Sequence, residues 1–361
     1  MSLAVVRSLH EVRRSSTPED LDDLEQELVD QFALAGVSAG VGDGSIAAER
    51  AVIFEFVRFT GRRVWVAGTN DADRYLAHQR RELGRAPSTV HGKALVLGRF
   101  YEFLVARYQG EIHASTGYAV EQVIDEFNKP ARAEYRTSVR VPPSEEEVEI
   151  LFGRWGQSLP TSRKYLIAAR DYLAASLWRR AGLRIAESLR LDLRDWRPDL
   201  GEHGKLHVRY GKGSMGRGPK PRLVPAINGV GGLLNWWLSD VRHQFGDDYD
   251  DPDAPLLPSE RREAGSGRSL RVGDNALRMS LGNAVNRWLP AWSGRMSPHV
   301  LRHYCASSLY ARGMDLKAIQ ELLGHEWLAT TTRYIHVHDA HIEQAWNEAN
   351  ARTAGRLGQG G

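Results

Sequence analysis

The sequence predicts two domains: an all-helical domain, then a mostly helical α+β domain with a small antiparallel sheet. A chain of 361 residues exceeds the usual size of a single domain. Between residues 45 and 108, apolar residues such as Ile53, Phe56 and Val57 recur at helical spacing. The second region is also helical in pattern, except that residues 205–225 alternate between apolar and polar side chains as paired strands do.

Shifts in composition give the boundaries that we expect for these parts. An acidic helix and a glycine-rich linker come first, and a polar, basic and proline-terminated stretch separates the two domains. Serine and glutamate at capping-box spacing open the second domain. The expected parts are an N-terminal segment (1–44), a helical domain (45–128), a linker (129–143), the α+β domain (144–340) and a C-terminal helix with a tail (341–361).

The charges gather in local stretches, although the net charge is only +3. Residues 74–107 hold seven lysines and arginines against two acids, and residues 205–222 hold six basic residues and no acid. Residues 19–30 carry seven acids and no basic residue. This distribution predicts localised anion-binding surfaces, with ordinary solvated helices as the alternative.

The cysteine content and the hydropathy of the sequence indicate the cellular compartment of the protein. The single cysteine, Cys305, excludes an internal disulfide and fits a reducing cytoplasm. Its apolar helical surroundings predict a buried small hydrophobic residue rather than a reactive thiol. No apolar run approaches eighteen residues and the N-terminus lacks a signal-peptide core, so we expect a cytoplasmic, nucleoid-associated protein without a membrane segment.

The residues with the most chemical potential lie between 297 and 334. His299 and Arg302 are three apart in a predicted helix and so share a face. A second helix ends at Gly324, and His325 follows at once. Three threonines then begin the segment that holds Tyr334. Two histidines, an arginine and a tyrosine are thus expected on short elements joined by tight turns.

These runs closely resemble the C-terminal signature of the tyrosine recombinases, the phage integrase family, including its Xer-like members. The signature comprises His299-Val-Leu-Arg302-His303, Leu322-Leu323-Gly324-His325 and Thr331-Thr332-Arg333-Tyr334-Ile335-His336-Val337. The run from Ala181 to Leu189 resembles the first arginine motif of the family, and Gly211-Lys212-Gly213 its hairpin lysine. The resemblance is strong over roughly 165–340, and the helical region 45–108 is similar to the family's core-DNA-binding domain with weaker motifs.

The resemblance implies a site-specific recombinase in which Tyr334 attacks a DNA phosphodiester and forms a 3′-phosphotyrosyl intermediate, with a Holliday junction following. Only ~0.1% of a tyrosine is ionised at neutral pH, so the attack needs assistance. Arg184 and Arg302 would clamp the non-bridging oxygens, and His299 and His325 would donate to them. Lysine would protonate the leaving 5′-oxygen. Neither a metal nor another cofactor is implied.

The identity of this lysine stays open between two residues. Lys212 matches the motif, but the loop from there to Val224 is long and contains prolines, so Lys220 is the alternative. The same loop matches a G-x-G-x-x-G pattern, yet the prolines after it cannot open the helix that dinucleotide binding requires. His299 and His303 have the spacing of a zinc pair, but the positive charge of Arg302 between them makes a metal site an unfavourable interpretation.

The resemblance also implies partners. The two domains would form a C-shaped clamp around double-stranded DNA with an inverted-repeat core site, and the C-terminal segment would join four copies into a tetramer. Accessory DNA-bending proteins are further expected partners. The basic residues that we expect to contact DNA are Arg209, Arg217, Lys220, Arg222, Lys93 and Arg99.

Two other functions fit the same residues. One is a catalytically inactive DNA-binding regulator on the same fold, and the full set of six catalytic candidates argues against it. The other is an enzyme like a type IB topoisomerase or a telomere resolvase. The sequence does not choose among integration, transposition and dimer resolution, and it does not identify the DNA target.

Overall fold

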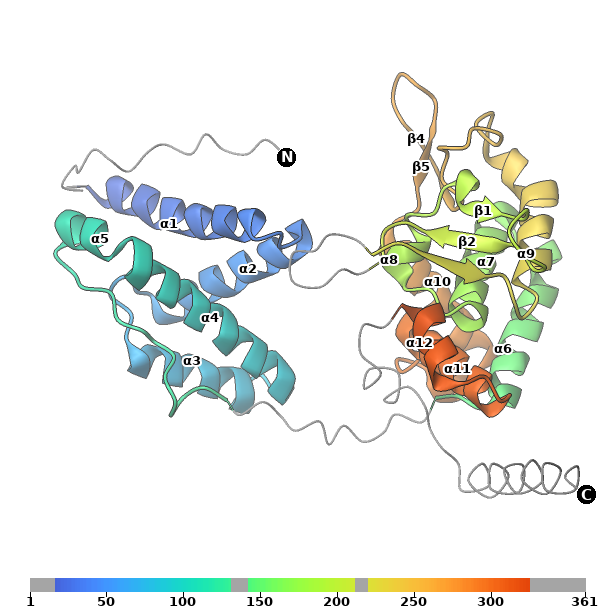
Figure 1. The fold of residues 1–361 in the computed structure, drawn as a ribbon. Coiled ribbons are helices and arrows are strands. Elements are labelled where there is room, and N and C mark those ends of the chain that lie inside the picture. The colour runs from blue at the N-terminus through green and yellow to red at the C-terminus, as the bar shows by residue number, and fades with distance from the viewer. Residues whose placement is uncertain (1–16, 131–141, 212–219, 325–361) are drawn as a thin grey trace, which may run out of the picture. The chain divides into compact units, whose positions relative to one another are not determined.

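The computed structural model describes residues 17–130, 142–211 and 220–324. The chain divides into two compact units. The first unit contains the described residues up to 130, and the second contains those from 142 onwards (Figure 1).

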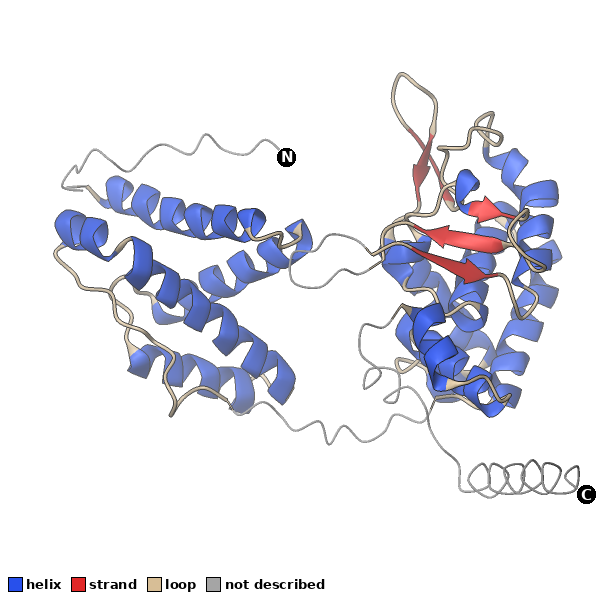
Figure 2. Cartoon of the chain, viewed as in Figure 1, coloured by secondary structure: helices blue, strands red, loops and turns tan. Residues whose placement is uncertain are grey.

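Helices joined by loops, with no strand, make up the described part of the first unit (Figure 2). Its helices are α1 (Pro18–Ser38), α2 (Asp43–Thr60), α3 (Thr69–Arg81), α4 (Pro87–Arg107) and α5 (Gln109–Thr116). α1 contacts α2 and α4 and contributes Leu28 and Val29 to the core of the unit. In the structure α1 therefore belongs to the first unit, whereas the sequence-based boundary at residue 44 sets it apart.

Aromatic side chains fill the core of the first unit. Phe56 meets the ring of Tyr75 edge to face with centroids 5.3 Å apart, and Phe100 meets Tyr101 in the same way at 5.6 Å. All four side chains are fully buried. Such edge-to-face pairs stabilise a core by about 1 kcal/mol beyond the burial of their area.

Two helices begin with a reciprocal capping pair, and the one that opens the second unit was expected from the sequence. The Thr17 hydroxyl accepts from the backbone N–H of Asp20 (3.2 Å), and the Asp20 carboxylate accepts from the N–H of Thr17 (3.1 Å). Ser144 and Glu147 form the same reciprocal pair at the start of the second unit's first helix (3.1 and 2.8 Å). Each pair satisfies N–H groups that the first turn of a helix leaves without a helical partner.

The second unit is mostly helical with two small antiparallel sheets, which confirms the predicted fold class. Its α-helices are α6 (Glu145–Ser158), α7 (Tyr165–Arg180), α8 (Ile185–Ser188), α9 (Val230–Trp236), α10 (Asp274–Trp288), α11 (Pro298–Ala311) and α12 (Leu316–Leu323). Its strands are β1 (Trp196–Arg197), β2 (Lys205–Val208), β3 (Arg222–Pro225), β4 (Pro258–Arg262) and β5 (Ser269–Arg271).

The predicted strand pair is present as β2 and β3. They run antiparallel, with Leu206 opposite Val224 and Val208 opposite Arg222, and β1 adds a third strand on the other side of β2. β4 and β5 form a separate hairpin that was not predicted, because helices were expected everywhere in this domain outside residues 205–225. The burial of β4 does not alternate and most of its residues face solvent, so the strand has no period-two signal.

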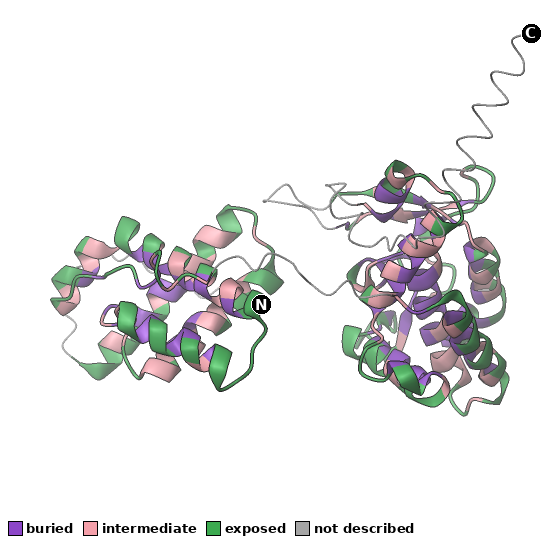
Figure 3. Ribbon diagram, turned by 90° about the horizontal axis from the view of Figure 1, so that it is seen from below, coloured by how far each residue is buried: buried purple, intermediate pink, exposed green. Residues whose placement is uncertain are grey.

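α7 lies at the centre of the second unit, in contact with α10 and α11. Leu173, Leu177 and Trp178 are fully buried on it, and Figure 3 shows the buried residues gathered in the interior of the unit. The indole N–H of Trp178 donates to the hydroxyl of Ser188 (3.0 Å). This bond ties α8 to the core helix and fixes the turn between them, where Arg184 lies.

Two further findings concern the limits set from composition. No helix in the described ranges is long and apolar enough to cross a membrane. Cys305 is buried in α11, as expected, and burial raises the pKa of its thiol to about 12.

Candidate active site

Three of the six predicted catalytic residues lie within the described residues: Arg184, His299 and Arg302. Lys212, His325 and Tyr334 lie outside them. Arg184 and Arg302 come together although 118 positions separate them in the sequence, because both contact the end of α12.

A tight turn after α7 presents Arg184. Gly182 has a φ of +61°, and a Cβ at this position would overlap the Leu323 side chain and lie 3.3 Å from the sulfur of Cys305. Only glycine suits both the left-handed backbone and the close packing. Arg184 then caps α8: its backbone N–H and its Nη1 donate to the two carboxylate oxygens of Glu187 (2.8 and 2.7 Å).

The buried side chain of Arg302 connects this turn to α12. Its side chain is 1% exposed. Nη1 donates to the carbonyl oxygen of Gly182, and Nη2 donates to that of Leu323 (2.7 Å). Its Nη1 also lies 3.9 Å from a carboxylate oxygen of Glu187. The buried guanidinium therefore joins the turn after α7, Glu187 and the last residue of α12.

Glu187 lies at the centre of a cluster of three arginines, Arg184, Arg222 and Arg302, which we call the arginine cluster. Arg222, the first residue of β3, donates to both of its carboxylate oxygens (2.9 Å each) and donates from Nε to the carbonyl oxygen of Leu322 (3.0 Å). Burial alone would raise the pKa of Glu187, but the hydrogen bonds and charge of Arg222, followed by the charge of Arg184, lower it to about 2. Three guanidinium groups around one ionised carboxylate leave a net positive charge, which suits an anionic ligand.

The histidines of α11 lie at its first turns. The hydroxyl of Ser297 caps this helix by accepting from the N–H of Val300 (3.3 Å). His299 is exposed, and its ring packs edge to face on that of His303 with centroids 4.9 Å apart. Within the described ranges no three His, Cys, Asp or Glu side chains come together as a metal site would need.

The end of α12 has the predicted form. Asp315 caps its start by accepting from the backbone N–H groups of Lys317 and Ala318 (2.9 Å each), and Gly324 ends it in the left-handed conformation with φ +65°. A Cβ on Gly324 would come within 2.9 to 3.1 Å of the Arg222 side chain. The chain thus leaves the arginine cluster at the residue before His325.

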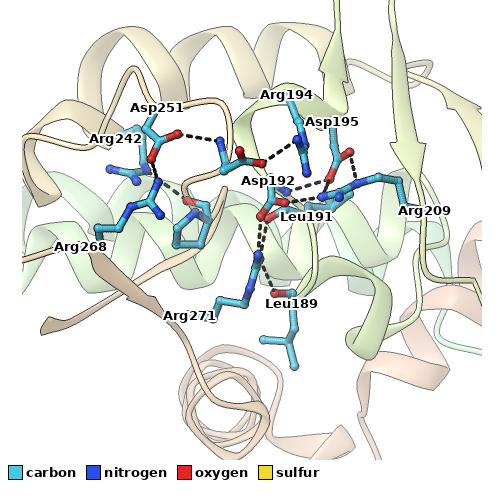
Figure 4. Close-up of polar contacts among 12 residues, drawn as sticks. Leu189, Leu191, Asp192, Arg194, Asp195, Arg209, Arg242, Asp251, Arg268 and Arg271 are labelled. Carbon is cyan, nitrogen blue, oxygen red and sulfur yellow. Dashed lines mark hydrogen bonds and ion pairs between the residues drawn. The ribbon is translucent and has the colours of Figure 1, made fainter. Parts of the chain in front are cut away.

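The basic residues predicted to contact DNA near the hairpin have different surroundings. Arg209 donates to both oxygens of Asp195 (2.7 and 2.9 Å) and to Asp192, as Figure 4 shows. Arg222 is held by Glu187, while Lys220 is exposed. Arg217 lies outside the described residues.

The two candidates in the first unit also have acidic partners. Lys93 donates to Glu55 (2.6 Å) and Gln79 (2.8 Å), and only 12% of its side chain is exposed. Arg99 pairs with Glu49 (2.6 Å) but remains 51% exposed, so part of it is accessible to a ligand. DNA contact at all six basic positions stays a prediction.

Glu187 had no predicted role, and Arg222 was predicted to contact DNA. The available signal for Glu187 was its position three residues after Arg184, where a carboxylate reaches back to cap the start of a helix. No local signal connects Arg222 to Glu187, because 35 residues separate them.

The arginine cluster gathers three guanidinium groups around Glu187 at the end of α12, next to the small sheet, and its positive charge makes it a candidate anion-binding site. Comparison with known proteins gives the family. Residues 157–341 match the phage integrase family. The match covers more than half of the chain, and the protein belongs to this family.

Curated relatives agree with this assignment. The tyrosine recombinase XerC of Haemophilus ducreyi is 28% identical over 290 residues, which cover 80% of this chain and 81% of the relative. XerC of Methylobacterium nodulans is 35% identical over 192 residues, and that match spans 53% of this chain and about half (52%) of the relative.

Solved structures show the same fold. XerH recombinase bound to palindromic difH substrate aligns with a TM-score of 0.58 at 19% identity, over 91% of this chain and 84% of that one. The Tn1549 transposon integrase in complex with transposon right end DNA aligns with a TM-score of 0.59 at 15% identity, over 90% of this chain and 99% of that one.

Proposed function

We propose that the protein is a site-specific DNA recombinase that cuts and rejoins strands through a phosphotyrosyl intermediate at Tyr334. The observation that carries the proposal is the convergence of Arg184 and Arg302 on the end of α12. Two permanent positive charges therefore lie at this helix end. The helix ends at Gly324, which is one residue before His325 and ten residues before Tyr334 in the sequence. Family membership and relatives named tyrosine recombinases support the same reaction.

The chemistry follows from the charges in the cluster. Attack of the tyrosine oxygen on phosphorus forms an O–P bond, breaks the bond from phosphorus to the 5′-oxygen, and passes through a pentacoordinate, doubly negative transition state. Arg184, with 26% of its side chain exposed, would contact a non-bridging oxygen, and Arg302 supplies a second charge next to it. Preorganised cations in a partly dry site stabilise such a state more than water does.

Proton transfers complete the step. The tyrosine gives up its proton on attack, with His299 as the candidate acceptor, and the leaving 5′-oxygen takes a proton from the hairpin lysine, Lys212 or Lys220. The phosphotyrosyl bond keeps the free energy of the broken phosphodiester, so a 5′-hydroxyl of another strand can displace the tyrosine by the same steps in reverse.

The proposal extends to the assembly. We expect the substrate to be duplex DNA with an inverted-repeat core, contacted by the helical domain (45–128) and by the catalytic domain (144–340). We also expect four copies to act together through the segment after Tyr334, on cytoplasmic DNA and with DNA-bending proteins where the site requires them. Whether the outcome is integration, transposition or dimer resolution depends on the DNA site.

The test is covalent capture of DNA. The full-length protein is mixed with a pool of duplexes with randomised cores, each nicked so that the cut strand diffuses away and religation fails. The wild-type protein should form a denaturant-resistant adduct, and the captured duplexes should share an inverted repeat. Tyr334→Phe should bind the same duplexes without forming the adduct, because the variant lacks the nucleophilic oxygen.

The matched control is Tyr249→Phe, which removes a hydroxyl from a tyrosine that is 51% exposed in the second unit. This variant should form the adduct at the wild-type rate. An adduct that persists in Tyr334→Phe would refute the assignment of the nucleophile. DNA binding without any adduct from the wild-type protein would favour the catalytically inactive regulator.

A further inference from the structure

Gly211, just after β2, and Lys220, just before β3, pack closely against each other. The backbone N–H of Lys220 donates to the carbonyl oxygen of Gly211 (3.1 Å). A Cβ on Gly211 would overlap the carbonyl oxygen of Lys220, so only glycine lets the two chains approach this far. Gly211 directly precedes Lys212, and Lys220 is the other candidate for the leaving-group acid. The positions of Gly211 and Lys220 therefore set where either lysine starts.

Arg209, two residues before Gly211, anchors the segment that follows β2. Arg209 makes two hydrogen bonds to Asp195 and one to Asp192 (Figure 4). Asp195 is 1% exposed and Asp192 is 4% exposed, so both carboxylates are fixed in the interior. Arg271 of β5 also donates to Asp192, which makes this anchor part of a wider network (Figure 4).

A second arginine holds the other chain from an equal distance. Arg222 lies two residues after Lys220, and each of its three guanidinium nitrogens donates to the protein: Nη1 and Nη2 to Glu187, and Nε to the carbonyl oxygen of Leu322. Its side chain is only 10% exposed. To contact a phosphate, Arg222 would have to leave a buried carboxylate without its principal partner, which is strongly unfavourable.

All three anchoring carboxylates lie in the short segment from 187 to 195, directly after Arg184. Glu187 is shared, because it binds both Arg222 and Arg184 (2.7 Å). A displacement of β3 relative to Glu187 would therefore separate the start of the lysine segment from the arginine that binds the phosphate. A two-point hydrogen-bonded fork fixes both distance and orientation, which a single contact does not.

We propose that Arg222 is a positioning residue: its paired bonds to Glu187 hold the Gly211–Lys220 end of the sheet in register with Arg184, so that the hairpin lysine meets the leaving 5′-oxygen. The inference rests on the proposed recombinase function. It assigns Arg222 no contact with the DNA. Loss of Arg222 should slow proton donation to the leaving group more than any other part of the reaction.

A change of leaving atom tests this directly. A captured duplex is synthesised in two forms, with the ordinary 5′-oxygen or with sulfur bridging the scissile phosphorus and the 5′-carbon. In the sulfur form the tyrosine O–P bond forms and the P–S bond breaks to release a thiolate. A thiol is far more acidic than an alcohol, so this leaving group needs no proton from the protein.

The variants are Arg222→Gln and Arg222→Lys in the full-length protein, with Arg197→Gln as the matched control. Arg197 lies on β1 of the same sheet and pairs with Asp199 at the surface (2.8 and 2.5 Å). Arg222→Gln removes the charge and the fork, while Arg222→Lys keeps the charge and loses the fork. The initial rate of adduct formation is measured on both duplexes.

Arg222→Gln should lower the rate on the oxygen duplex by about 100-fold or more, within the range that general acid catalysis contributes. On the sulfur duplex its rate should stay within a few-fold of wild type. Arg222→Lys should lie between the two on oxygen, and Arg197→Gln should match wild type on both. If Arg222→Gln unfolds at the assay temperature, the ratio of the two rates for Arg222→Lys decides.

Two results would overturn the inference: a wild-type rate for Arg222→Gln on the oxygen duplex, or an equal loss on both duplexes. Equal loss would mean that Arg222 acts on the phosphate-binding arginines and not on the acid. A wild-type protein that forms no adduct with either duplex would refute the proposed function, and the inference with it. The wild-type control therefore separates the two failures.

Discussion

Arg302 donates a 2.7 Å hydrogen bond to the carbonyl oxygen of Leu323, the last residue of α12. The bond is buried and joins α11, in the second unit, to the end of α12, two residues before His325. The same guanidinium also reaches the carbonyl oxygen of Gly182 at the turn before Arg184. One side chain thus fixes both ends of the candidate phosphate site.

Replacement of Arg302 by lysine should therefore abolish most of the activity while keeping the charge. A lysine ammonium is compact and cannot span both carbonyl oxygens, so the two turns lose their common partner. We expect the rate of adduct formation to fall by about 100- to 1,000-fold, as much as the loss of one preorganised transition-state donor, because the turn before Arg184 and the end of α12 are no longer held together. The measurement is the initial rate on a captured, nicked duplex.

Arg312→Lys is the matched control. Arg312 caps the end of the same helix, is 54% exposed, and pairs with Glu145 at the surface (2.5 Å). This variant should cut at the wild-type rate, since surface pairs contribute less than about 1 kcal/mol. If Arg302→Lys also kept a rate within a few-fold of wild type, Arg302 would have no special role.

Gly182→Ala should destabilise the catalytic unit by about 1–3 kcal/mol. The methyl group would overlap the Leu323 side chain, and the φ of +61° disfavours any residue other than glycine. Urea unfolding followed by tryptophan fluorescence measures this, because Trp65 is the only tryptophan before residue 142 and the signal comes mainly from the second unit.

Gly232→Ala provides the comparison. Gly232 lies in α9 with no atom near an added Cβ, so alanine there should leave stability unchanged or raise it by up to about 1 kcal/mol. Equal unfolding midpoints for the two variants would show that the turn at Gly182 tolerates a side chain and that the close packing is not required.

Local signals predicted a large part of this structure. The capped helix starts at Thr17 and Ser144, the paired strands β2 and β3, and the helix end at Gly324 were all predictable. In each case the residues that specify the element lie within a few positions of it, so the pattern and its physical cause appear together in the sequence.

The missed features depend on partners distant in sequence. β4 and β5 are held partly by Asp248, whose carboxylate accepts from the backbone N–H and hydroxyl of Ser269 (2.7 and 2.9 Å). The pairing of Arg222 with Glu187 was not predicted either, because 35 residues separate the two. The chain has 48 basic and 45 acidic residues, and only the fold decides which of them pair.

The buried carboxylate of Glu187 should give the catalytic unit a dependence on acid. Its pKa is about 2 in the folded protein, against an ordinary value of 4.5. Because the folded value is the lower one, the stabilisation is complete above pH 4.5 and is lost as pH falls towards 2. Urea midpoints between pH 6 and pH 3 should fall more steeply for wild type than for Glu187→Gln, which cannot titrate.

Glu202→Gln tests whether this slope belongs to Glu187. Glu202 is exposed in the turn between β1 and β2, so its removal should leave the wild-type slope in place. Identical slopes for Glu187→Gln and wild type would exclude Glu187 as the source of the acid sensitivity.

Arg209 distinguishes stability from DNA affinity. Its partners Asp192 and Asp195 are buried, so Arg209→Gln leaves Asp195 without its arginine and Asp192 with Arg271 alone, and should lower the unfolding free energy by about 1–3 kcal/mol. The exposed Lys220 has the opposite expectation: Lys220→Gln should leave stability unchanged and reduce the salt dependence of DNA binding by about one phosphate contact.

Arg194→Gln, which removes a surface pair with Asp253 (2.6 Å), is the control and should change neither stability nor the salt dependence of DNA binding. A reduced salt slope for Arg209→Gln at unchanged stability would mean that Arg209 exchanges its aspartates for DNA phosphate, and the network in Figure 4 would then be a feature of the DNA-free protein alone.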